Sequence, residues 1–376
     1  MAFGAKPADE AFHVRQRFQV CKMKGNEMNR REFIAATSAA TLAATALKAR
    51  GAEAGRPSPL TRQAPVVGCE NVTGRKVRGT RAKVYFTRTI SAESLIALYD
   101  RVSESIHGRV AVKLHTGERH GPNIIPPAMA KPLLAHIPES AIVETNTMYD
   151  GDRYTTAAHR KTLKINGWTF CPVDILDEEA DVRFPVRNGF HLKDVAVGGH
   201  LANYDSLVVL THFKGHAMGG FGGSLKNIAI GCASGQGGKR QVHGYPTGDM
   251  PPTGADWAKM PDKETFMELM ADSGKAICDH FGKRIVFLNV LRRMSVSCDC
   301  EGVAAMEPTI PDIGILASTD ILAIDQASVD LVYSSASNKD LVERIESRHG
   351  LRQLSAMREL KMGNPRYELI DVTAAV

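Results

Sequence analysis

The sequence predicts an α/β fold, in which a mostly parallel or mixed sheet carries helices on both faces in Rossmann-like layers. The chain has 376 residues, and 43% of them are hydrophobic, which is enough for a large core. Its 33 glycines and only 6% aromatic residues favour a loop-rich protein over a bundle of long helices. Strand-like and helix-like segments alternate along the chain, as is typical of a sheet covered by helices. A disordered chain, a collagen-like polymer and a small disulfide-rich module are excluded.

The first half of the domain is predicted from periodicity and from the residues that begin and end each helix. Ser91 is expected to cap the first helix, and Gly167 to end the third. Strands are expected at 81–88, 109–115 and 141–145, and helices at 92–106, 127–136 and 154–166.

The second half begins with the apolar run SLVVLT at 206–211, which turn-forming residues bound on both sides. A run of this kind is typical of a buried parallel strand. A helix is expected to open near Lys226 and Asn227, and Asp320 is expected to cap a later helix. The remaining strands are expected at 284–291, 313–316 and 367–370, and the remaining helices at 263–281, 324–333 and 351–360.

Residues 28–54 are predicted to be a twin-arginine export signal. Arg30 and Arg31 precede a weakly apolar Ala/Thr run that ends at Leu47, and the small-residue pattern Ala52-Glu53-Ala54 follows. This order predicts cleavage after Ala54, and the run is too short and too rich in Ala and Thr to anchor the chain in a bilayer. We therefore expect the twin-arginine translocation machinery as a partner, a periplasmic or extracytoplasmic location and no stable membrane span. An amphipathic N-terminal helix is the alternative.

The rest of the chain divides around this leader. Residues 1–27 are predicted to be an upstream extension, since Met28 immediately precedes the arginine pair, and residues 55–80 are predicted to be a linker or arm. Residues 81–376 are expected to form the α/β domain, in one or two lobes. Residues 1–54 hold nine of the 47 Lys and Arg and five of the 41 Asp and Glu, so the formal charge of +6 falls to about +2 without them. The charge pattern therefore gives no support to a nucleic-acid partner.

A glycine-rich loop follows the run SLVVLT and is the first candidate site. Glycine lets backbone N–H groups approach a ligand closely, and the start of a helix attracts anions, so a phosphate, carboxylate or cluster is expected here. The spacing is neither that of a Walker loop nor that of a dinucleotide fingerprint. A glycine-rich turn with two satisfied histidines is the structural alternative. The residues of interest are His212, His216, Gly222, Gly223, Lys226, Asn227 and Cys232.

The segment SVSCDCEG, after the strand that ends near Leu291, is the second candidate site. Cys298 and Cys300 are separated by one residue, and in an extended loop both would point to the same side, which suits two thiolates on one metal or cluster. Cys232 would supply a third thiolate, one fewer than an ordinary iron–sulfur cluster takes. A strained disulfide or two inert thiols are the alternatives. Lys113 and His115, at the end of another strand, are further candidates for cofactor binding.

At these residues the sequence resembles the family catalogued as domain of unknown function 362. The matching stretches are VKLHTGE, THFKGHAMGGFGGSLKNIAIGCAS, CDCEG, PDIGILASTDILAIDQASVDLV and HGLRQLSAMRELKMGNPRYELI. Members of that family are often described as iron–sulfur proteins, frequently through a ferredoxin module with Cys-x-x-Cys-x-x-Cys repeats, and this sequence has no such repeat. The resemblance carries over to His212, His216, Gly222, Gly223, Lys226, Cys232, Cys298 and Cys300.

A weaker similarity relates the glycine-rich loop, with its His and Lys, to the lactate racemase family. That resemblance implies a nickel pincer nucleotide anchored by a lysine, with paired histidines acting as acid and base. No second racemase motif is present in the sequence.

The leading prediction is therefore an exported metal- or iron–sulfur-binding protein with possible redox activity. Cys298 and Cys300, together with Cys232, would hold the cluster or another thiophilic metal. His212, His216 and Lys226 would line a pocket for a small anionic substrate, or the partner would be a redox protein. The alternatives are a racemase- or isomerase-like enzyme and a non-catalytic metal-binding protein.

Overall fold

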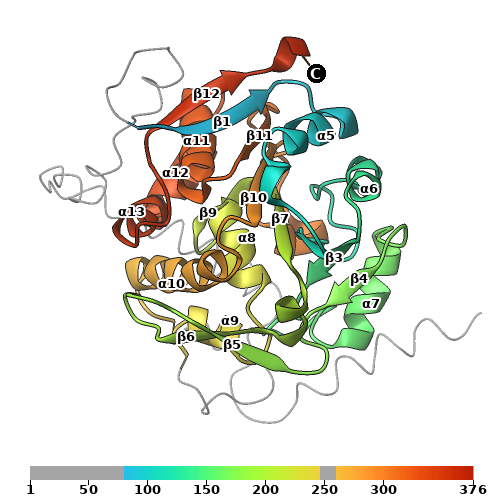
Figure 1. Ribbon diagram of the computed structural model, residues 1–376. Coiled ribbons are helices and arrows are strands. Elements are labelled where there is room, and N and C mark those ends of the chain that lie inside the picture. The colour runs from blue at the N-terminus through green and yellow to red at the C-terminus, as the bar shows by residue number, and fades with distance from the viewer. Residues whose placement is uncertain (1–79, 246–259, 376) are drawn as a thin grey trace, which may run out of the picture. The chain divides into compact units, whose positions relative to one another are not determined.

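The central sheet has eight strands, and their order in space differs from their order along the chain (Figure 1). The computed structural model describes residues 80–245 and 260–375, so the predicted leader and nearly all of the predicted linker lie outside the described residues. From one edge to the other the strands are β12 (Tyr367–Asp371), β1 (Ala82–Thr87), β11 (Gly314–Ser318), β10 (Ile285–Leu291), β7 (Ser206–His212), β2 (Val110–Lys113), β3 (Ser140–Glu144) and β4 (Val173–Ile175).

The sheet is mixed, which confirms the predicted fold class. Strands β10, β7, β2, β3 and β4 run parallel to one another, and β12 is parallel to β1. Strand β11 is antiparallel to both of its neighbours, β1 and β10. Because β7 and β10 are adjacent and parallel, the loops that leave their carboxyl ends emerge at the same edge of the sheet.

Helices cover both faces of the sheet, with α5, α6 and α7 on one side and α8, α10, α11 and α13 on the other (Figure 1). The helices are α5 (Ala92–Asp100), α6 (Pro127–His136), α7 (Thr156–Ile165), α8 (Ser224–Gly231), α9 (Gly238–Val242), α10 (Lys263–Phe281), α11 (Ile321–Ser334), α12 (Lys339–Ser347) and α13 (Arg352–Glu359). Short 3-10 helices are η2 (Ser103–Ser105), η3 (Gly199–Asn203), η5 (Asp299–Ala304) and η6 (Thr373–Ala375). In the part of the chain that the structure describes, no helix is both long and apolar enough to cross a membrane.

The two faces of the sheet belong to two hydrophobic cores. Along β7, Leu207 and Val209 pack in one core, and Val208 and Leu210 pack in the other. This alternation follows from the two-residue repeat of a strand, and burial on both faces explains why the strand reads as a continuous apolar run.

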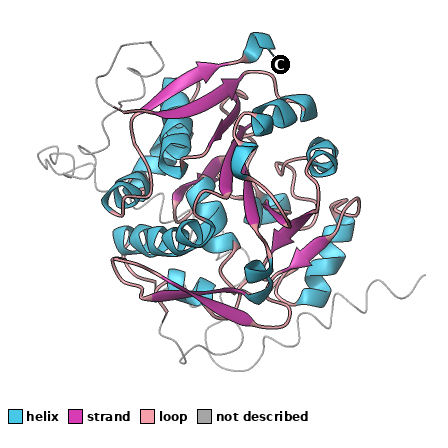
Figure 2. Cartoon of the chain, in the orientation of Figure 1, coloured by secondary structure: helices cyan, strands magenta, loops and turns pink. Residues whose placement is uncertain are grey.

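Most predicted elements are present, and the differences fall where local patterns are weak. The predicted helix 92–106 ends early, since α5 stops at Asp100 and only the 3-10 turn η2 follows. Ser91 and Asp320 are N-caps, as predicted. The edge strand β4, two small ribbons and the helices α9 and α12 were not predicted (Figure 2). The ribbons pair β5 (Asp181–Pro185) with β6 (Asp194–Gly198) and β8 (Lys214–His216) with β9 (Gly220–Gly222).

Candidate metal and anion site

The two predicted loops meet at the carboxyl ends of β7 and β10. Val290 of β10 lies opposite His212 of β7, so the chain leaves the sheet at matching positions in both strands. The first loop forms the β8–β9 ribbon, whose Gly215 N–H donates to the carbonyl of Ser295 in the second loop (2.7 Å). The folded chain therefore places the glycine-rich loop directly against the segment that leads into the two cysteines.

Three potential metal ligands come together where the loops meet. One donor atom each of His216, Cys298 and Cys300 lies within 4.8 Å of the other two. His216 and Cys298 are buried, and Cys300 is partly buried. Two sulfurs and one imidazole nitrogen form a donor set that suits a thiophilic divalent ion.

The backbone around Cys298 differs from the extended loop that the sequence predicted. Cys298 is extended, but Cys300 lies within the 3-10 helix η5, for which Cys298 is the N-cap. The N–H of Cys300 donates to Sγ of Cys298 (3.5 Å), and the carboxylate of Glu301 accepts the N–H of Cys298 (2.9 Å). The two thiols are therefore brought together by a helix cap and not by the alternation of a strand.

His216 is held by the backbone of its own loop. Its Nδ1 accepts hydrogen bonds from the N–H groups of Met218 (3.2 Å) and Gly219 (2.8 Å), so the neutral ring carries its proton on Nε2. The hydrogen bond between His216 and Cys298 is consequently made by Nε2–H. Burial and the ammonium group of Lys226 lower the pKa of His216 to about 4.

The two thiols shift each other's pKa in opposite directions. The thiol of Cys300 donates to Cys298, and this bond, together with Lys226 and His216, holds the pKa of Cys298 well below its usual range against the effect of burial. The same bond and burial raise the pKa of Cys300 well above its usual range.

Asp299, between the two cysteines, is anchored to the end of β7. Its Oδ2 lies 2.7 Å from Nδ1 of His212 and 2.9 Å from Nζ of Lys214. Nε2 of His212 lies 2.7 Å from the carbonyl of Arg292. Both partners of the ring accept only, so both nitrogens donate and His212 is an imidazolium. The geometry gives His212 a positioning role and leaves it no nitrogen for acid–base or metal chemistry.

Lys226 lies beside the thiols and has no described partner. Its charge acts on both cysteines and on His216 and His243. Within residues 80–245 and 260–375, no hydrogen bond or ion pair of Lys226 is present. The lysine that the sequence predicted for an anion site is thus adjacent to the donor group.

A second buried polar layer surrounds Glu144 at the end of β3. Its carboxylate accepts from Lys113 (2.9 Å) and from the backbone of Thr116 (2.9 Å), and it lies 3.5 Å from Nδ1 of His115. Burial alone would raise the pKa of Glu144, but Lys113, His115 and Arg153 hold it well below its usual range. Nε2 of His115 is buried and has no hydrogen-bond partner among the residues that the structure describes.

Two of the predicted cofactor-binding residues are committed to this layer. The ammonium of Lys113 donates to Glu144, to the carbonyl of Leu114 and to Oδ1 of Asn227. The amide nitrogen of Asn227 contacts the carbonyls of Lys113 (3.3 Å) and Leu210 (3.1 Å). Lys113 and Asn227 therefore tie β2, β3, β7 and α8 together, and neither keeps a free donor for a ligand.

The start of α8 is already capped by the chain's own carboxylate. Asp325 accepts the N–H groups of Ser224 (2.8 Å) and Leu225 (2.9 Å). A Cβ on Gly223 would lie 2.6 Å from that carboxylate, so Gly223 is needed for the cap, whereas Gly222 faces the flexible chain of Lys226. The predicted anion site at this helix start is therefore filled.

Cys232 lies outside the donor group. It is the C-cap residue of α8, whereas the glycine-rich loop enters the same helix at Ser224. A helix rises about 1.5 Å per residue, so the eight residues between these ends carry Cys232 away from the loop. Burial raises the pKa of its thiol to about 12, and His216 takes the third position that the sequence assigned to Cys232.

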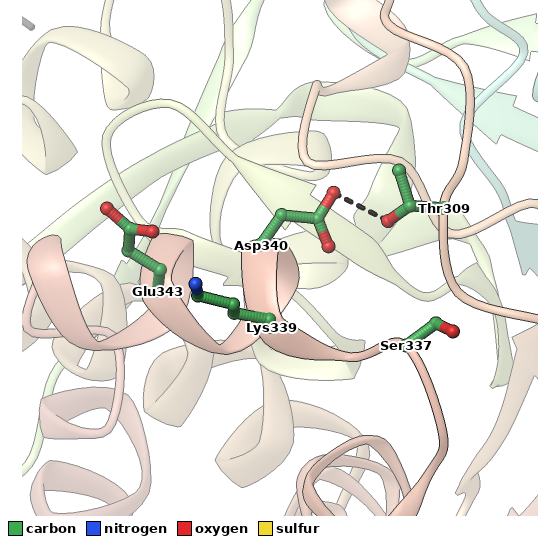
Figure 3. A pocket seen from close by; sticks show the side chains of 5 residues that line it. All are labelled: Thr309, Ser337, Lys339, Asp340 and Glu343. Atoms are coloured by element: carbon green, nitrogen blue, oxygen red, sulfur yellow. Dashed lines mark hydrogen bonds between the residues drawn. The ribbon is translucent and has the colours of Figure 1, made fainter.

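Two other features lie apart from the donor group. Asp174, Glu178 and His200 also form a close group, but both ring nitrogens of His200 face carboxylates, those of Asp174 (2.8 Å) and Glu179 (3.5 Å). That arrangement is an ion-pair network near the surface. Two shallow hollows follow α12 and contain none of the predicted site residues. One is lined by Thr309, Ser337, Lys339, Asp340 and Glu343 (Figure 3).

Sequence reasoning missed the charged groups that hold the site in place. Asp299 lies inside the Cys-x-Cys motif and Lys214 between the two histidines, so both were visible within the quoted motifs. Arg153 and Glu144 had no local signal, because their partners are distant in the sequence.

Comparison with known proteins gives one family match. The family described as "Domain of unknown function (DUF362)" matches residues 110–330, which include both loops and strands β2 to β11. No curated protein matches the chain.

Two solved structures are similar over part of the chain. One is the lactate racemase apoprotein from Thermoanaerobacterium thermosaccharolyticum, with 12% identity and a TM-score of 0.34 over 66% of this chain and 56% of the other. The second is a structural genomics target from Thermotoga maritima, with 12% identity and a TM-score of 0.34 over 70% of this chain and 58% of the other. The chain thus spans little more than half the length of either structure, and the similarity is too low to bear on function.

Proposed function

The chain belongs to the DUF362 family, and we propose that it is a metal-binding protein whose ion is held by Cys298, Cys300 and His216. The observation that carries the proposal is the mutual approach of these three donor atoms within 4.8 Å. They come from two loops that are 82 residues apart in sequence, from His216 to Cys298, and the contact between His212 and Asp299 ties the second loop to the end of β7.

The donor set favours a single thiophilic ion over an ordinary iron–sulfur cluster. Zinc and similar ions bind two cysteines and one histidine with a fourth position open, whereas ordinary clusters take four thiolates. Among the described residues, the group contains two thiols, and Cys171, Cys232 and Cys278 lie outside it. An iron–sulfur cluster and redox activity remain predictions that require ligands beyond this group.

The fourth position separates a reactive site from a storage site. A carrier saturates its ion with protein ligands, whereas three protein ligands leave room for an exogenous group. When bound, a divalent ion would supply Lewis-acid chemistry at that position. The alternative in which His212 and His216 act as acid and base has less support, because both nitrogens of His212 already donate to acceptors.

Metal binding must displace protons from this group. Both sulfurs bind as thiolates, and the ring of His216 must lose its Nε2 proton or give up the backbone bonds at Nδ1. Affinity for the ion should therefore rise with pH. The same requirement makes His216 the weakest of the three assigned ligands and the one that a variant must test separately.

Export is a further part of the proposal. The predicted leader at 28–54 would send the protein out of the cytoplasm already folded, and a bound ion would protect the two thiols in an oxidising compartment. N-terminal sequencing of protein from the periplasmic fraction should begin after Ala54. Protein found only in the cytoplasm, with residues 28–54 intact, would contradict export.

The test of the metal site is the metal content of the full chain purified anaerobically. We expect about one equivalent of a divalent metal in the wild type, and its loss in Cys298→Ser, Cys300→Ser and in the double variant. Acid-labile sulfide and the visible spectrum identify a cluster if one is present. Cobalt(II) substitution should give a sulfur-to-metal absorption band that disappears in the same variants.

Cys171→Ser is the matched control, because Cys171 is partly exposed and lies outside the group. It should bind metal as the wild type does. His216→Ala should weaken binding while leaving the cobalt–sulfur band, since two sulfurs remain. A metal-free wild type that also fails to take up cobalt would overturn the proposal and leave a hydrogen-bonded thiol pair without a metal.

A further inference from the structure

Lys226 is a cation in a position that its own helix disfavours. It is the third residue of α8, in the first turn, where the partial positive charge of the helix dipole repels an ammonium group. The carboxylate of Asp325 is not available to offset it, because it already accepts the N–H groups of Ser224 and Leu225. A local arrangement that opposes a general electrostatic preference is most common at functional sites.

Among the described residues, Lys113 and Lys214 of the site have ion-pair partners and Lys226 has none. Lys113 pairs with Glu144 at 2.9 Å and Lys214 with Asp299 at 2.9 Å. In the two described ranges, 80–245 and 260–375, no carboxylate lies within ion-pair distance of Lys226. Its ammonium is half-buried and acts on the thiol pair and on His216, which are the proposed ligands.

Lys226 places a positive charge beside the proposed ion. Two thiolates neutralise a divalent ion, and a neutral imidazole changes nothing, so the ion and its protein ligands have no net charge. His212 and Lys214 share the one carboxylate of Asp299, which adds a further positive charge next to the cysteines. A negatively charged exogenous ligand at the open coordination position would offset these charges, whereas a neutral ligand would leave them.

We propose that this position and Lys226 together bind a small carboxylate. The inference rests on the proposed metal site and specifies the class of ligand that completes it. A carboxylate can place one oxygen toward the ion and the other toward the ammonium group, which donates charged hydrogen bonds to carboxylates in many proteins. Lys226 is on this view a ligand-binding residue and not a metal ligand.

The test uses the full chain loaded with cobalt(II), whose visible spectrum reports changes in coordination. Acetate is the carboxylate probe, acetamide its neutral analogue of the same shape, and inorganic phosphate the more highly charged anion. We expect acetate to change the spectrum with saturation and acetamide to leave it unchanged. In Lys226→Met the acetate affinity should fall about tenfold or more, since a charged hydrogen bond is lost. Lys226→Arg should retain most of it.

Lys275→Met is the matched control, because Lys275 pairs with Asp279 on the exposed side of α10. It should bind cobalt and acetate as the wild type does. Absence of the cobalt–sulfur band would show that the metal site itself is wrong, and the inference would fall with it. A normal band with no acetate response, or with equal responses in wild type and Lys226→Met, would overturn the inference alone. Tighter binding of phosphate than of acetate would overturn the assignment of a carboxylate.

Discussion

Nδ1 of His212 lies 2.7 Å from Oδ2 of Asp299, and this contact joins the end of β7 to the Cys-x-Cys segment. Both groups are almost fully buried. Burial alone would raise the pKa of Asp299, but the His212 imidazolium and Lys214 hold it well below its usual range. Because Asp299 lies between the cysteines, fixing its carboxylate fixes the backbone from which both thiols project.

Asp299→Asn should destabilise the fold and weaken metal binding together. The change leaves His212 and Lys214 as buried cations without a carboxylate, which should lower the free energy of unfolding by about 3–5 kcal/mol. Metal affinity should fall by about 10- to 100-fold, as is common when a group that orients the ligands is lost. Urea unfolding of the metal-free protein and competition with a chelator measure the two effects.

Asp279→Asn is the control, since Asp279 pairs with Lys275 on the surface and should cost about 0.5 kcal/mol or less. If Asp299→Asn unfolds like the control variant and binds metal with wild-type affinity, the contact with His212 does not position the cysteines.

Gly215→Ala should push the two loops of the site apart. A Cβ at Gly215 would lie 2.6 Å from both Cα and the carbonyl oxygen of Val296, and neither backbone atom can move without shifting the cysteine loop. We expect a loss of about 1–3 kcal/mol in stability and weaker metal binding. Thermal unfolding and metal titration of the purified variant check both.

Gly222→Ala provides the comparison within the same ribbon. Its Cβ would meet Cδ of Lys226 at 3.4 Å, and that side chain can move aside, whereas Cε of Lys214 at 3.8 Å is at an ordinary van der Waals distance. Stability should therefore change by about 0.5 kcal/mol or less. Equal effects of the two substitutions would contradict the view that Gly215 is required by close backbone approach.

The strands and long helices could be predicted from the sequence because their signals are local. The apolar run of β7 and the periodicity and bounds of α10 are read within one segment, and Asp320 caps α11 with its own side chain. The direction of β11 could not be predicted, since an antiparallel strand and a parallel one have the same composition. The three-residue strands β8 and β9 contain too few residues to show a repeat.

The site was predicted in part for the same reason. Cys298 and Cys300 lie in one short motif, and His216 lies in a loop of unusual glycine content, so each of these residues has a local sequence signal. The identity of the third residue beside the cysteines depends on how two loops that are distant in the sequence meet. The sequence indicated Cys232, whereas the structure places His216 there. The roles of His212 and Glu144 depend on charged partners far along the chain, which no local pattern contains.

His159 should make the protein sensitive to acid. Its ring is fully buried, and burial together with the guanidinium of Arg153 lowers its pKa to about 3, from about 6.5 in an unfolded chain. The unfolded state therefore takes up the proton first as the pH falls. The contribution of His159 to stability is complete above about pH 6.5 and declines toward pH 3, by about 2 kcal/mol between pH 6.5 and 5.

His159→Asn should flatten this slope, because Asn can still donate to Oδ1 of Asn146, as Nδ1 of His159 does, and does not titrate. Urea unfolding at a series of pH values measures the difference. His136→Asn, at a surface histidine that is 41% exposed, should leave the slope nearly unchanged. A wild-type slope in His159→Asn would show that other groups cause the acid sensitivity.

His115→Phe tests whether a buried nitrogen without a partner is a cost to stability. Nε2 of His115 has no hydrogen-bond partner, and Glu144 keeps its bonds to Lys113 and Thr116 when the imidazole is removed. Leaving a buried polar atom unpaired costs about 1–3 kcal/mol, so an aromatic ring of similar shape should be neutral or stabilising by up to that amount. Metal affinity should not change, since His115 is not in the donor group.

Thr116→Val, which removes a hydroxyl bond to Glu144, should instead destabilise. A large loss of stability in His115→Phe would mean that the imidazole is needed for the Glu144 layer, and unchanged stability with lost acetate binding would assign Nε2 to the ligand.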